Sequence, residues 1–493
     1  MNDDLTLNEK PSFFCKFSDF VWMIELLFAL AAFALILHTT PDKHTLTEAA
    51  PYALLLIAVL AAVFAAARFA GRRSAVLAPA LLLVFAVLSQ VLAVVSIDSQ
   101  PISDFGLMYN SALSAVNGDY SWLELHSWLE LQYYRNWAYQ IPFVMYEALV
   151  LTVCNSLRAL QIMNIFFAVG CIWLVYMLSA LYLEQDKAVL AGFAYALCPA
   201  AFILTPVLTN QHISLFFMLL GIYVFLRYQD AGTKDRYISA AAAGALLAVG
   251  NLMRAEAVVI ILSIIFCTLI YRCCRKGIKE ILPAALLTLV YFALQFAVGK
   301  IFFLCGIAPY GIGNNVPQWK FVVGLDFITG GTYTNRNEFI LSMSDNAARW
   351  QETISAIKRS HAEGMSITSL VMNKIKAFWH SGEPLYFVFT GGSDSVLGLD
   401  LNTFSKKFYL YERAYRLCLY LLAFASGVKM LVCRRREFCF ALRLMTTIVC
   451  VLFVVYLLIE VQSRYRYVVN PFAVLTVSAL LLKPRARERS GKL

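Results

Sequence analysis

Long apolar runs separated by short polar segments occupy most of this chain of 493 residues. A helix needs about 20 apolar residues to cross the roughly 30 Å hydrocarbon core of a bilayer. Runs of this length predict about twelve membrane spans: Phe20–Leu37, Tyr52–Ala70, Val76–Ile97, Ala159–Leu183, Ala188–Leu204, Val207–Phe225, Ile238–Leu252, Ala255–Tyr271, Ile281–Leu304, Phe408–Val432, Phe440–Ile459 and Tyr467–Leu482. The pattern therefore predicts an all-α polytopic membrane protein.

The basic residues between these runs predict the orientation of the chain, because short cytoplasmic loops are enriched in Lys and Arg. The basic loops all fall on one side: Arg72 with Arg73, Lys234 with Arg236, Arg272 with Arg275 and Lys276, Arg434 to Arg436, and the tail from Lys483 to Arg489. This agreement requires that the short apolar piece Pro142–Cys154 does not cross, so we predict an interfacial or re-entrant helix there. Both termini are then cytoplasmic.

The overall composition agrees with a membrane protein. The chain is 60% hydrophobic and only 15% charged, whereas soluble domains average about a quarter charged residues. The net charge of +10 is explained by the basic loops and does not indicate nucleic acid. Most of the 12 cysteines lie in apolar runs or basic loops without metal-site spacing, so we interpret them as apolar filler or reduced thiols.

Two long segments are predicted on the outer side, about Asp98–Arg158 and about Cys305–Lys407. The second is long enough for a small α-containing subdomain, with an amphipathic helical stretch from about Asp345 to Trp379 broken at Gly364. The sequence thus divides into a three-span unit, a first outer loop, central helices, an outer subdomain and a C-terminal three-span unit: 1–97, 98–158, 159–304, 305–407 and 408–493.

The first outer loop contains the most suggestive carboxylate, Asp104, which follows the third span closely and comes just after Pro101. A carboxylate at the membrane edge suits a general base, but Ser103 and Asp104 are also good helix N-caps. We expect Asp119, Glu124 and Glu130 on solvated helix faces. The loop's aromatic residues suit stacking on sugars or an interfacial belt, and we expect the belt for most of them: Trp122, Trp128, Tyr133, Tyr134, Trp137 and Tyr139.

Several short motifs resemble the GT-C superfamily of glycosyltransferases, which includes protein O-mannosyltransferases and lipid A aminoarabinose transferases. The first outer loop has an acidic residue, Asp104, and later the stretch YRNWAYQIPFVMYEAL. The turn CPAAFILTPVLTNQHIS is similar to a proline-containing outer turn of the family, although Asn210, Gln211 and His212 stand where many relatives have an acid. NLMRAEA and EVQSRYRYVVNP resemble two further outer motifs and contain the matching residues Arg254, Glu460, Arg464, Tyr465 and Pro471.

The resemblance implies transfer of a sugar from a polyprenyl-phosphate carrier, with Asp104 as the catalytic base. The donor phosphate is expected to contact Arg464, Arg254, Arg466 and Tyr465. The guanidinium of Arg is permanently charged and can donate two parallel hydrogen bonds to phosphate oxygens. Substrate contacts are expected from Tyr139, Gln140, Asn210, His212 and Glu460. Snorkelling, or ion pairs of Arg254 with Glu256 and of Arg464 with Glu460, are the structural alternatives.

No cofactor is predicted beyond the lipid-linked donor, and the absence of an Asp-x-Asp pattern argues against an essential divalent metal. Glycan, glycolipid and protein acceptors all remain open. We expect an integral protein of the bacterial plasma membrane with an extracytoplasmic active site. A transporter or flippase of a lipid-linked glycan is the alternative, but the chain lacks the two similar halves typical of transporters. Glu25, inside the first span, needs a partner that the sequence does not identify.

Overall fold

The structure is a computed structural model that describes residues 13–40, 43–124, 133–433 and 439–482. Apart from one two-stranded hairpin, its regular elements are helices, which confirms the all-α fold class. Some of the predicted features lie outside the described residues: Trp128, Glu130, Arg434 to Arg436 and the tail from Lys483.

Nine helices of the described part are long and apolar enough to cross a membrane, and they coincide with nine of the predicted spans. They are α1 (Phe13–His38), α2 (Lys43–Arg73), α3 (Leu77–Ser96), α7 (Leu157–Ser179), α11 (Thr233–Met253), α12 (Ala257–Cys267) continued by η3 (Thr268–Cys273) and α13 (Cys274–Lys276), α14 (Leu282–Leu304) preceded by η4 (Ile278–Ile281), α19 (Leu401–Val432) and α20 (Phe440–Leu458).

The other three predicted spans are shorter or interrupted helices. They correspond to α8 (Gln185–Ala196) with α9 (Pro199–Ile203), to α10 (Gln211–Arg227), and to η8 (Ser463–Val468) with α21 (Val469–Val477) and η9 (Ser478–Leu481). Proline cannot donate a backbone hydrogen bond, so it begins α9 instead of continuing α8. Eight of the nine residues of α21 are buried, so the longer helices around it supply its cover. The total of twelve spans stays a prediction.

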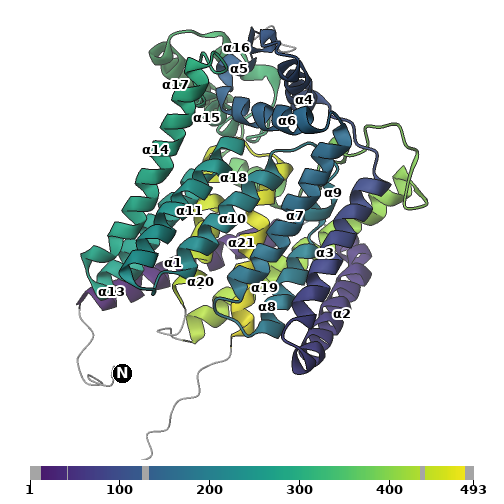
Figure 1. Cartoon of the computed structure of the whole chain (residues 1–493), viewed down its shortest axis with the longest axis vertical. Helices are drawn as coiled ribbons and strands as arrows, with labels where there is room; N and C mark the ends of the chain where they lie inside the picture. The colour runs from purple at the N-terminus through teal and green to yellow at the C-terminus, as the bar shows by residue number, and fades with distance from the viewer. Residues whose placement is uncertain (1–12, 41–42, 125–132, 434–438, 483–493) are drawn as a thin grey trace, which may run out of the picture.

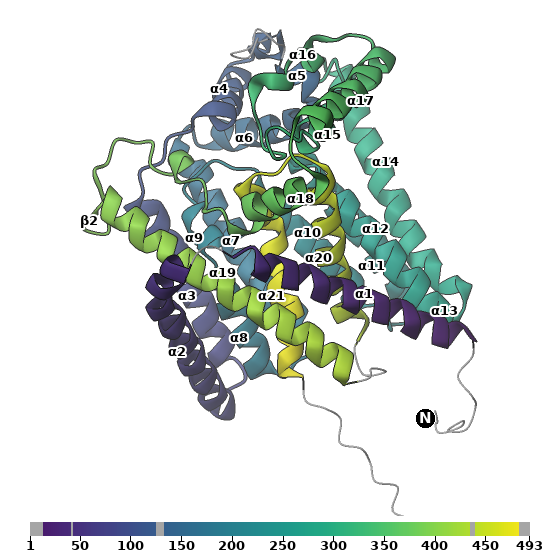
Figure 2. The same cartoon turned by 180° about the vertical axis from the view of Figure 1, so that it is seen from behind.

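The two predicted outer segments form a layer at one end of the bundle, where Figures 1 and 2 show α4, α5, α6, α15, α16 and α17 together. The first segment contains α4 (Ser103–Val116), η1 (Ser121–Glu124), α5 (Tyr133–Asn136), η2 (Ala138–Gln140) and α6 (Ile141–Val153). The second contains α15 (Gln318–Gly324), η5 (Asn335–Asn337), α16 (Phe339–Ser342), α17 (Asn346–Glu363), α18 (Ile367–Ile375), η6 (Lys376–His380), η7 (Leu385–Phe387), β1 (Ser395–Val396) and β2 (Leu399–Asp400). The two strands are antiparallel, with Ser395 opposite Asp400.

The predicted amphipathic stretch is present as α17 and α18, with a break between them at Gly364. Asp345 caps α17 by accepting hydrogen bonds from the backbone N–H groups of Ala347 and Ala348. A β-carbon on Gly364 would lie 2.5 Å from the carbonyl oxygen of Phe327, so only glycine fits this close approach. The break therefore follows from packing as well as from helix propensity.

The apolar piece around Pro142 is the 13-residue helix α6, which lies in the outer layer beside α4 (Figure 1). It is shorter than the nine candidate spans, as expected for a helix that does not cross. The opposite end of the bundle contains a network of basic residues. There Arg272 bonds Asp230 at 3.0 Å and Glu280 at 2.8 Å. This separation agrees with the predicted sidedness.

Glu25 finds its partners on two other helices. Its Oε1 accepts a hydrogen bond of 2.6 Å from the Thr447 hydroxyl of α20, and its Oε2 accepts one from the Tyr271 hydroxyl of η3. An ionisable group within a bundle is costly unless it is paired. Glu25 therefore connects α1 to the rest of the bundle.

Helix α11 packs on α14 through Gly244, and we expect Gly244→Ala to destabilise the protein. A β-carbon there would lie 2.3 Å from the carbonyl oxygen of Leu287, which is backbone and cannot rotate away. Small residues allow such close approach between membrane helices. The clash should cost about 1–3 kcal/mol and lower the unfolding temperature measured in detergent. Gly299→Ala is the matched control, because its new methyl group meets Ile312 only at an ordinary 3.4 Å. Equal unfolding temperatures for the two variants would contradict this packing.

Candidate active site

A cavity of about 590 Å³ lies between the outer layer and the end of the bundle. Its walls come from distant parts of the chain: α4, α5 to η2, the start of α10, the turn between α11 and α12, α15, residues 332–341, 384–387 and 456–465. Eight of the ten predicted site residues line it, namely Asp104, Tyr139, Gln140, Asn210, Arg254, Glu460, Arg464 and Tyr465. The structure thus brings together residues that are more than 350 positions apart in the sequence, such as Asp104 and Arg464.

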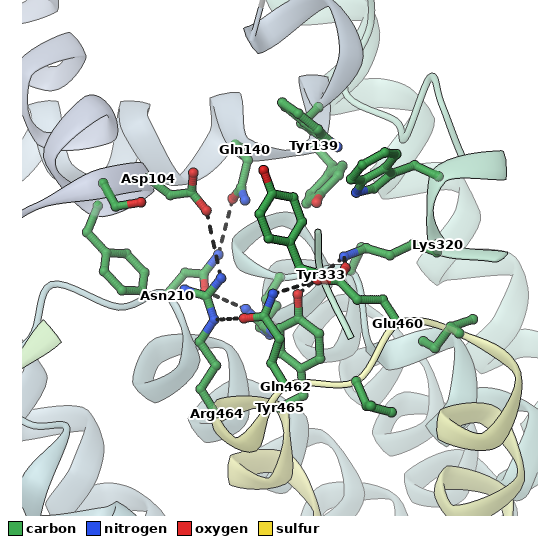
Figure 3. A pocket seen from close by; sticks show the side chains of 18 of the residues that line it. Asp104, Tyr139, Gln140, Asn210, Lys320, Tyr333, Glu460, Gln462, Arg464 and Tyr465 are labelled. Atoms are coloured by element: carbon green, nitrogen blue, oxygen red, sulfur yellow. Dashed lines mark hydrogen bonds and ion pairs between the residues drawn. The ribbon is translucent and has the colours of Figure 1, made fainter. Parts of the chain in front are cut away.

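Asp104 lies in the first turn of α4, at the mouth of the cavity (Figure 3). The residue before it, Ser103, has a φ of +53°, a conformation that is strained for any residue with a β-carbon. The helix N-cap is Ile102, and no side chain caps it. The alternative that Asp104 caps the helix is therefore wrong, and its carboxylate, with 38% side-chain exposure, is directed to the cavity instead.

Arg464 faces Asp104 from the opposite wall, with 3.7 Å between its Nη2 and the Asp104 Oδ2. Its guanidinium lies against two aromatic rings, 5.4 Å from the centroid of Phe105 and 5.2 Å from that of Phe387. Its Nε donates a 2.7 Å hydrogen bond to Gln462. These contacts fix the plane of the guanidinium while its end remains in the cavity.

Lys320 and Glu460 form the second charged pair of the cavity, with 2.5 Å between Nζ and Oε2. Burial opposes the charge on Lys320, but the Glu460 carboxylate outweighs it and raises the pKa of Lys320. Burial likewise opposes the charge on Glu460, and the Lys320 ammonium overcomes this and lowers the pKa of Glu460. Both groups are charged at neutral pH. The sequence reasoning missed Lys320, whose only signal is a single charge within the apolar helix QWKFVVG.

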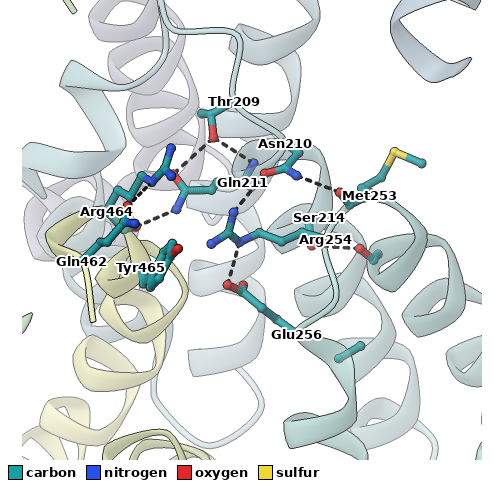
Figure 4. A network of polar contacts seen from close by, with 12 residues as sticks. Thr209, Asn210, Gln211, Ser214, Met253, Arg254, Glu256, Gln462, Arg464 and Tyr465 are labelled. Atoms are coloured by element: carbon teal, nitrogen blue, oxygen red, sulfur yellow. Dashed lines mark hydrogen bonds and ion pairs between the residues drawn. The ribbon is translucent and has the colours of Figure 1, made fainter. Parts of the chain in front are cut away.

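Arg254 forms the third charged pair, and Figure 4 shows it between Glu256 and Asn210. Its Nε donates to Glu256 at 2.6 Å and its Nη1 to Asn210 at 3.1 Å. Asn210 in turn donates to Gln140 at 3.2 Å. The ion pair with Glu256 that the sequence offered as an alternative is therefore present, while Arg254 also faces the cavity.

All three cations surround the ring of Tyr465. The ring centroid is 5.2 Å from the Arg254 guanidinium, 5.3 Å from the Lys320 ammonium and 5.7 Å from the Arg464 guanidinium. Each of these cations also has a carboxylate within 4 Å, so the wall of the cavity is a set of paired charges. Arg464 has the longest of the three contacts, and its guanidinium is therefore the one most open to an anionic group such as a phosphate.

Two predicted site residues, Arg466 and His212, do not line the cavity, so the structure does not bring them together with the other eight. Arg466 is 1% exposed and pairs with the buried Glu383 at 2.5 Å. It lies in the 3₁₀-helix η8, where three residues make one turn, so the side chains of residues two apart differ in direction by about 120°. Arg464 and Arg466 therefore face different surroundings. His212 is fully buried, with Nδ1 2.6 Å from the Tyr467 hydroxyl.

The aromatic residues of the first outer loop support the cavity from behind more than they form an interfacial belt. Trp122 and Tyr134 are buried and pack edge to face with centroids 4.8 Å apart. Tyr133, Trp137 and Tyr139 line the cavity itself. Burial, the largest effect, raises the pKa of the Tyr139 hydroxyl, which therefore stays protonated at neutral pH.

Three carboxylates of the cavity, Asp104, Glu256 and Glu460, pair with cations, and a fourth, Glu338, accepts a hydrogen bond from the Tyr333 hydroxyl. Within the described residues, no group of three His, Cys, Asp or Glu side chains is arranged to hold a metal ion.

Lys374 of α18 anchors the floor of the cavity. Its buried Nζ donates 2.7 Å hydrogen bonds to the carbonyl oxygens of Gly324 and Ile459. Burial lowers the pKa of Lys374 to about 7. A neutral amine has two N–H donors, which match these two acceptors. Lys374 thereby joins α15 to the chain segment that carries Glu460.

The fold and the cavity define the class of protein: a polytopic helical protein with a cavity at the end of its bundle that is lined by paired charges. The family model described as dolichyl-phosphate-mannose-protein mannosyltransferase matches residues 142–298. This match confirms the resemblance to the GT-C superfamily. The matched stretch includes Asn210 and Arg254, whereas Asp104, Lys320 and Arg464 lie outside it.

Two solved structures of oligosaccharyltransferases from one archaeon show a distant similarity. The oligosaccharyltransferase AglB from Archaeoglobus fulgidus, in complex with an inhibitory peptide and a dolichol-phosphate, is 12% identical with a TM-score of 0.44 over 82% of this chain and 50% of that chain. The apo form of the A. fulgidus oligosaccharyltransferase is 14% identical with a TM-score of 0.45, again over 82% and 50%. The chain thus spans about half the length of these proteins. It matches no curated protein.

We expect the stability of the protein to rise from about pH 7 to pH 10 through Lys374. The unfolded lysine has a pKa of about 10.4, so in this range the unfolded chain binds more protons than the folded one. The free energy of unfolding then rises with pH, by at most about 1.4 kcal/mol per pH unit. Thermal unfolding in detergent should show this rise in the wild type and not in Lys374→Met. Lys358→Met, at an exposed position of α17, should retain it, and parallel curves for Lys374→Met and wild type would refute the assignment.

Proposed function

We propose that this protein is an integral-membrane glycosyltransferase that transfers a sugar from a polyprenyl-phosphate carrier to a hydroxyl of an extracytoplasmic glycan, lipid or protein. The observation that carries the proposal is the pair Asp104 and Arg464, a carboxylate and a guanidinium in loose contact at 3.7 Å on the cavity wall, which the substrates separate when they bind. Sugar transfer from a phosphate needs a base on one side of the anomeric carbon and a cation on the other.

Asp104 is the proposed base. It accepts the proton of the acceptor hydroxyl while the hydroxyl oxygen forms a bond to the anomeric carbon. At 3.7 Å, its contact with Arg464 is longer than a hydrogen bond, so the carboxylate oxygens remain open to the acceptor hydroxyl. The strained backbone at Ser103 directs Asp104 into the cavity, and such strain is typical of functional positions.

Arg464 is the proposed direct partner of the leaving phosphate. The bond between the anomeric carbon and the phosphate oxygen breaks with its electron pair on the phosphate, which leaves as the polyprenyl-phosphate anion. Arg254 and Lys320 each already bind a carboxylate at 2.6 Å and 2.5 Å, whereas the pair of Arg464 is more than 1 Å longer. Arg464 therefore exchanges its partner most easily, and the other two cations keep their carboxylate partners.

The location of the cavity suits a lipid-linked donor. The cavity lies between the bundle and the outer layer, so the prenyl chain can remain in the bilayer while the phosphate reaches the three cations. With the predicted orientation of the basic loops, this end faces away from the cytoplasm.

The test is transfer by the purified protein in liposomes that contain a radiolabelled polyprenyl-phosphate hexose and a mixture of envelope acceptors. Asp104→Asn should lower kcat about 10²- to 10⁴-fold, because an amide cannot take the proton, while the KM for the donor changes little. Product formation is measured by chromatography of the labelled glycan.

Asp119→Asn is the matched control for Asp104→Asn. Asp119 belongs to the same outer loop but is exposed, and its Oδ1 only accepts a 2.9 Å hydrogen bond from the backbone of Ser121. The Asp119→Asn variant should transfer sugar at the wild-type rate. Wild-type transfer by Asp104→Asn contradicts the assignment of the base, and lipid transport across the liposome without any product would favour a transporter instead.

A further inference from the structure

Tyr333, a residue that the sequence did not single out, enters the cavity from the second outer segment. Figure 3 shows its side chain between Asp104 on one side and Lys320 on the other. Burial, the largest effect, raises the pKa of its hydroxyl, and the Glu338 carboxylate to which this hydroxyl is hydrogen-bonded adds to the effect. Tyr333 therefore lies beside the proposed base and beside the group of cations.

The turn that carries Tyr333 is fixed to the floor of the cavity. Gly330 and Gly331 precede it with φ values of +71° and +82°, so the chain makes a bend there that side chains with a β-carbon disfavour. The carbonyl oxygen of Gly331 accepts a 3.1 Å hydrogen bond from the backbone N–H of Val461. A β-carbon on Gly331 would lie 2.9 Å from the Lys374 side chain. The position of the Tyr333 ring is thus set by the same segment that carries Glu460.

The loop beyond Tyr333 is also closed by buried polar contacts. Asn337 donates a 2.9 Å hydrogen bond to Asp326, and both side chains are buried. The Tyr333 hydroxyl donates to Glu338 at 2.7 Å, and Trp319 packs against the Tyr333 ring with centroids 6.1 Å apart. A ring held in this way forms a preorganised wall.

Despite these contacts, the Tyr333 side chain is 41% exposed and faces the cavity. An aromatic face next to a carboxylate matches a pyranose ring, whose axial C–H groups form an apolar face and whose hydroxyls donate to carboxylate oxygens. None of the described residues that line the cavity belongs to a strand, so the cavity offers no sheet edge with which an extended peptide could pair.

We propose that Tyr333 and Glu338 form the acceptor subsite of the cavity and that the acceptor is a sugar ring, as in a glycan or a glycolipid headgroup. This inference rests on the proposed function. The Tyr333 ring packs on the acceptor sugar, the Glu338 carboxylate accepts a hydrogen bond from one of its hydroxyls, and another hydroxyl then lies beside Asp104. With the acceptor in place, the ring also excludes water from the anomeric carbon of the donor.

The experiment uses the full chain in liposomes, the labelled polyprenyl-phosphate hexose, and two kinds of acceptor at equal concentration: a panel of octyl glycopyranosides and an acetylated peptide rich in Ser and Thr. Two products are measured, the glycosylated acceptor and the free sugar released by hydrolysis. The wild type should glycosylate at least one octyl glycoside.

Tyr333→Ala should lower kcat/KM for the octyl glycoside at least about 10-fold, because the stacking face is lost, with the donor KM within about 2-fold. Its ratio of hydrolysis to transfer should rise. Tyr333→Phe keeps the ring and removes only the hydroxyl, so its loss should be about 3- to 10-fold. Glu338→Gln should raise the KM for the octyl glycoside, because an amide oxygen accepts a weaker hydrogen bond than a carboxylate oxygen does.

Tyr310→Phe is the matched control, because Tyr310 is a partly buried tyrosine of the same outer segment that also pairs with a glutamate, Glu124, at 3.4 Å and does not line the cavity. It should behave as wild type. Transfer to the peptide but to no glycoside, or wild-type acceptor kinetics in Tyr333→Ala, overturns the acceptor subsite while the glycosyltransferase proposal stands. A wild type that consumes no donor overturns both.

Discussion

The buried ion pair between Lys320 and Glu460 is the contact on which the rest of the site depends. It joins α15 of the outer segment to the end of α20, across 140 residues of sequence. Glu460 is 2% exposed, and a carboxylate left there without its lysine would cost several kcal/mol. Glu460 also accepts a 2.6 Å hydrogen bond from Gln462, which accepts one from Arg464. The same pair that closes the outer layer onto the bundle therefore orients the arginine that faces Asp104.

The charges of the cavity are arranged for a site that must be stable without its ligand. Three cations around the Tyr465 ring would repel one another, so each has a carboxylate partner, Glu256, Glu460 or Asp104. Only the contact of Asp104 with Arg464 is longer than a hydrogen bond, and these are the two groups for which the proposed reaction needs a change of partner. Ionic contacts that are short and buried maintain the structure, and the long, partly exposed one is available for chemistry.

Hydrophobicity along the chain was sufficient for the fold class and for nine helices of the described part that are long enough to cross a membrane, because burial in lipid requires long apolar helices. That the shorter α6 does not cross stays a prediction. Motif resemblance pointed to Asp104, Arg254 and Arg464, which the structure brings to one cavity, and their roles stay proposals. It also pointed to Arg466, which does not line that cavity, because the 3₁₀ geometry of η8 turns the side chain toward Glu383. It likewise pointed to His212, which packs on Tyr467 inside the bundle, and it overlooked Lys320, Tyr333 and Lys374, which lie in a segment without recognised motifs.

The sequence by itself determined that this chain is a helical membrane protein with its candidate chemistry on one side, because apolar length and basic loops are local properties that each segment carries alone. Only the tertiary structure decided which charged residues meet. Lys320 and Glu460, or Asp104 and Arg464, are adjacent because the outer layer folds back over the bundle, and no local pattern encodes a contact between segments that far apart. Pairing of charges is a property of the packed chain, since a buried charge is stable only beside a partner that packing brings to it.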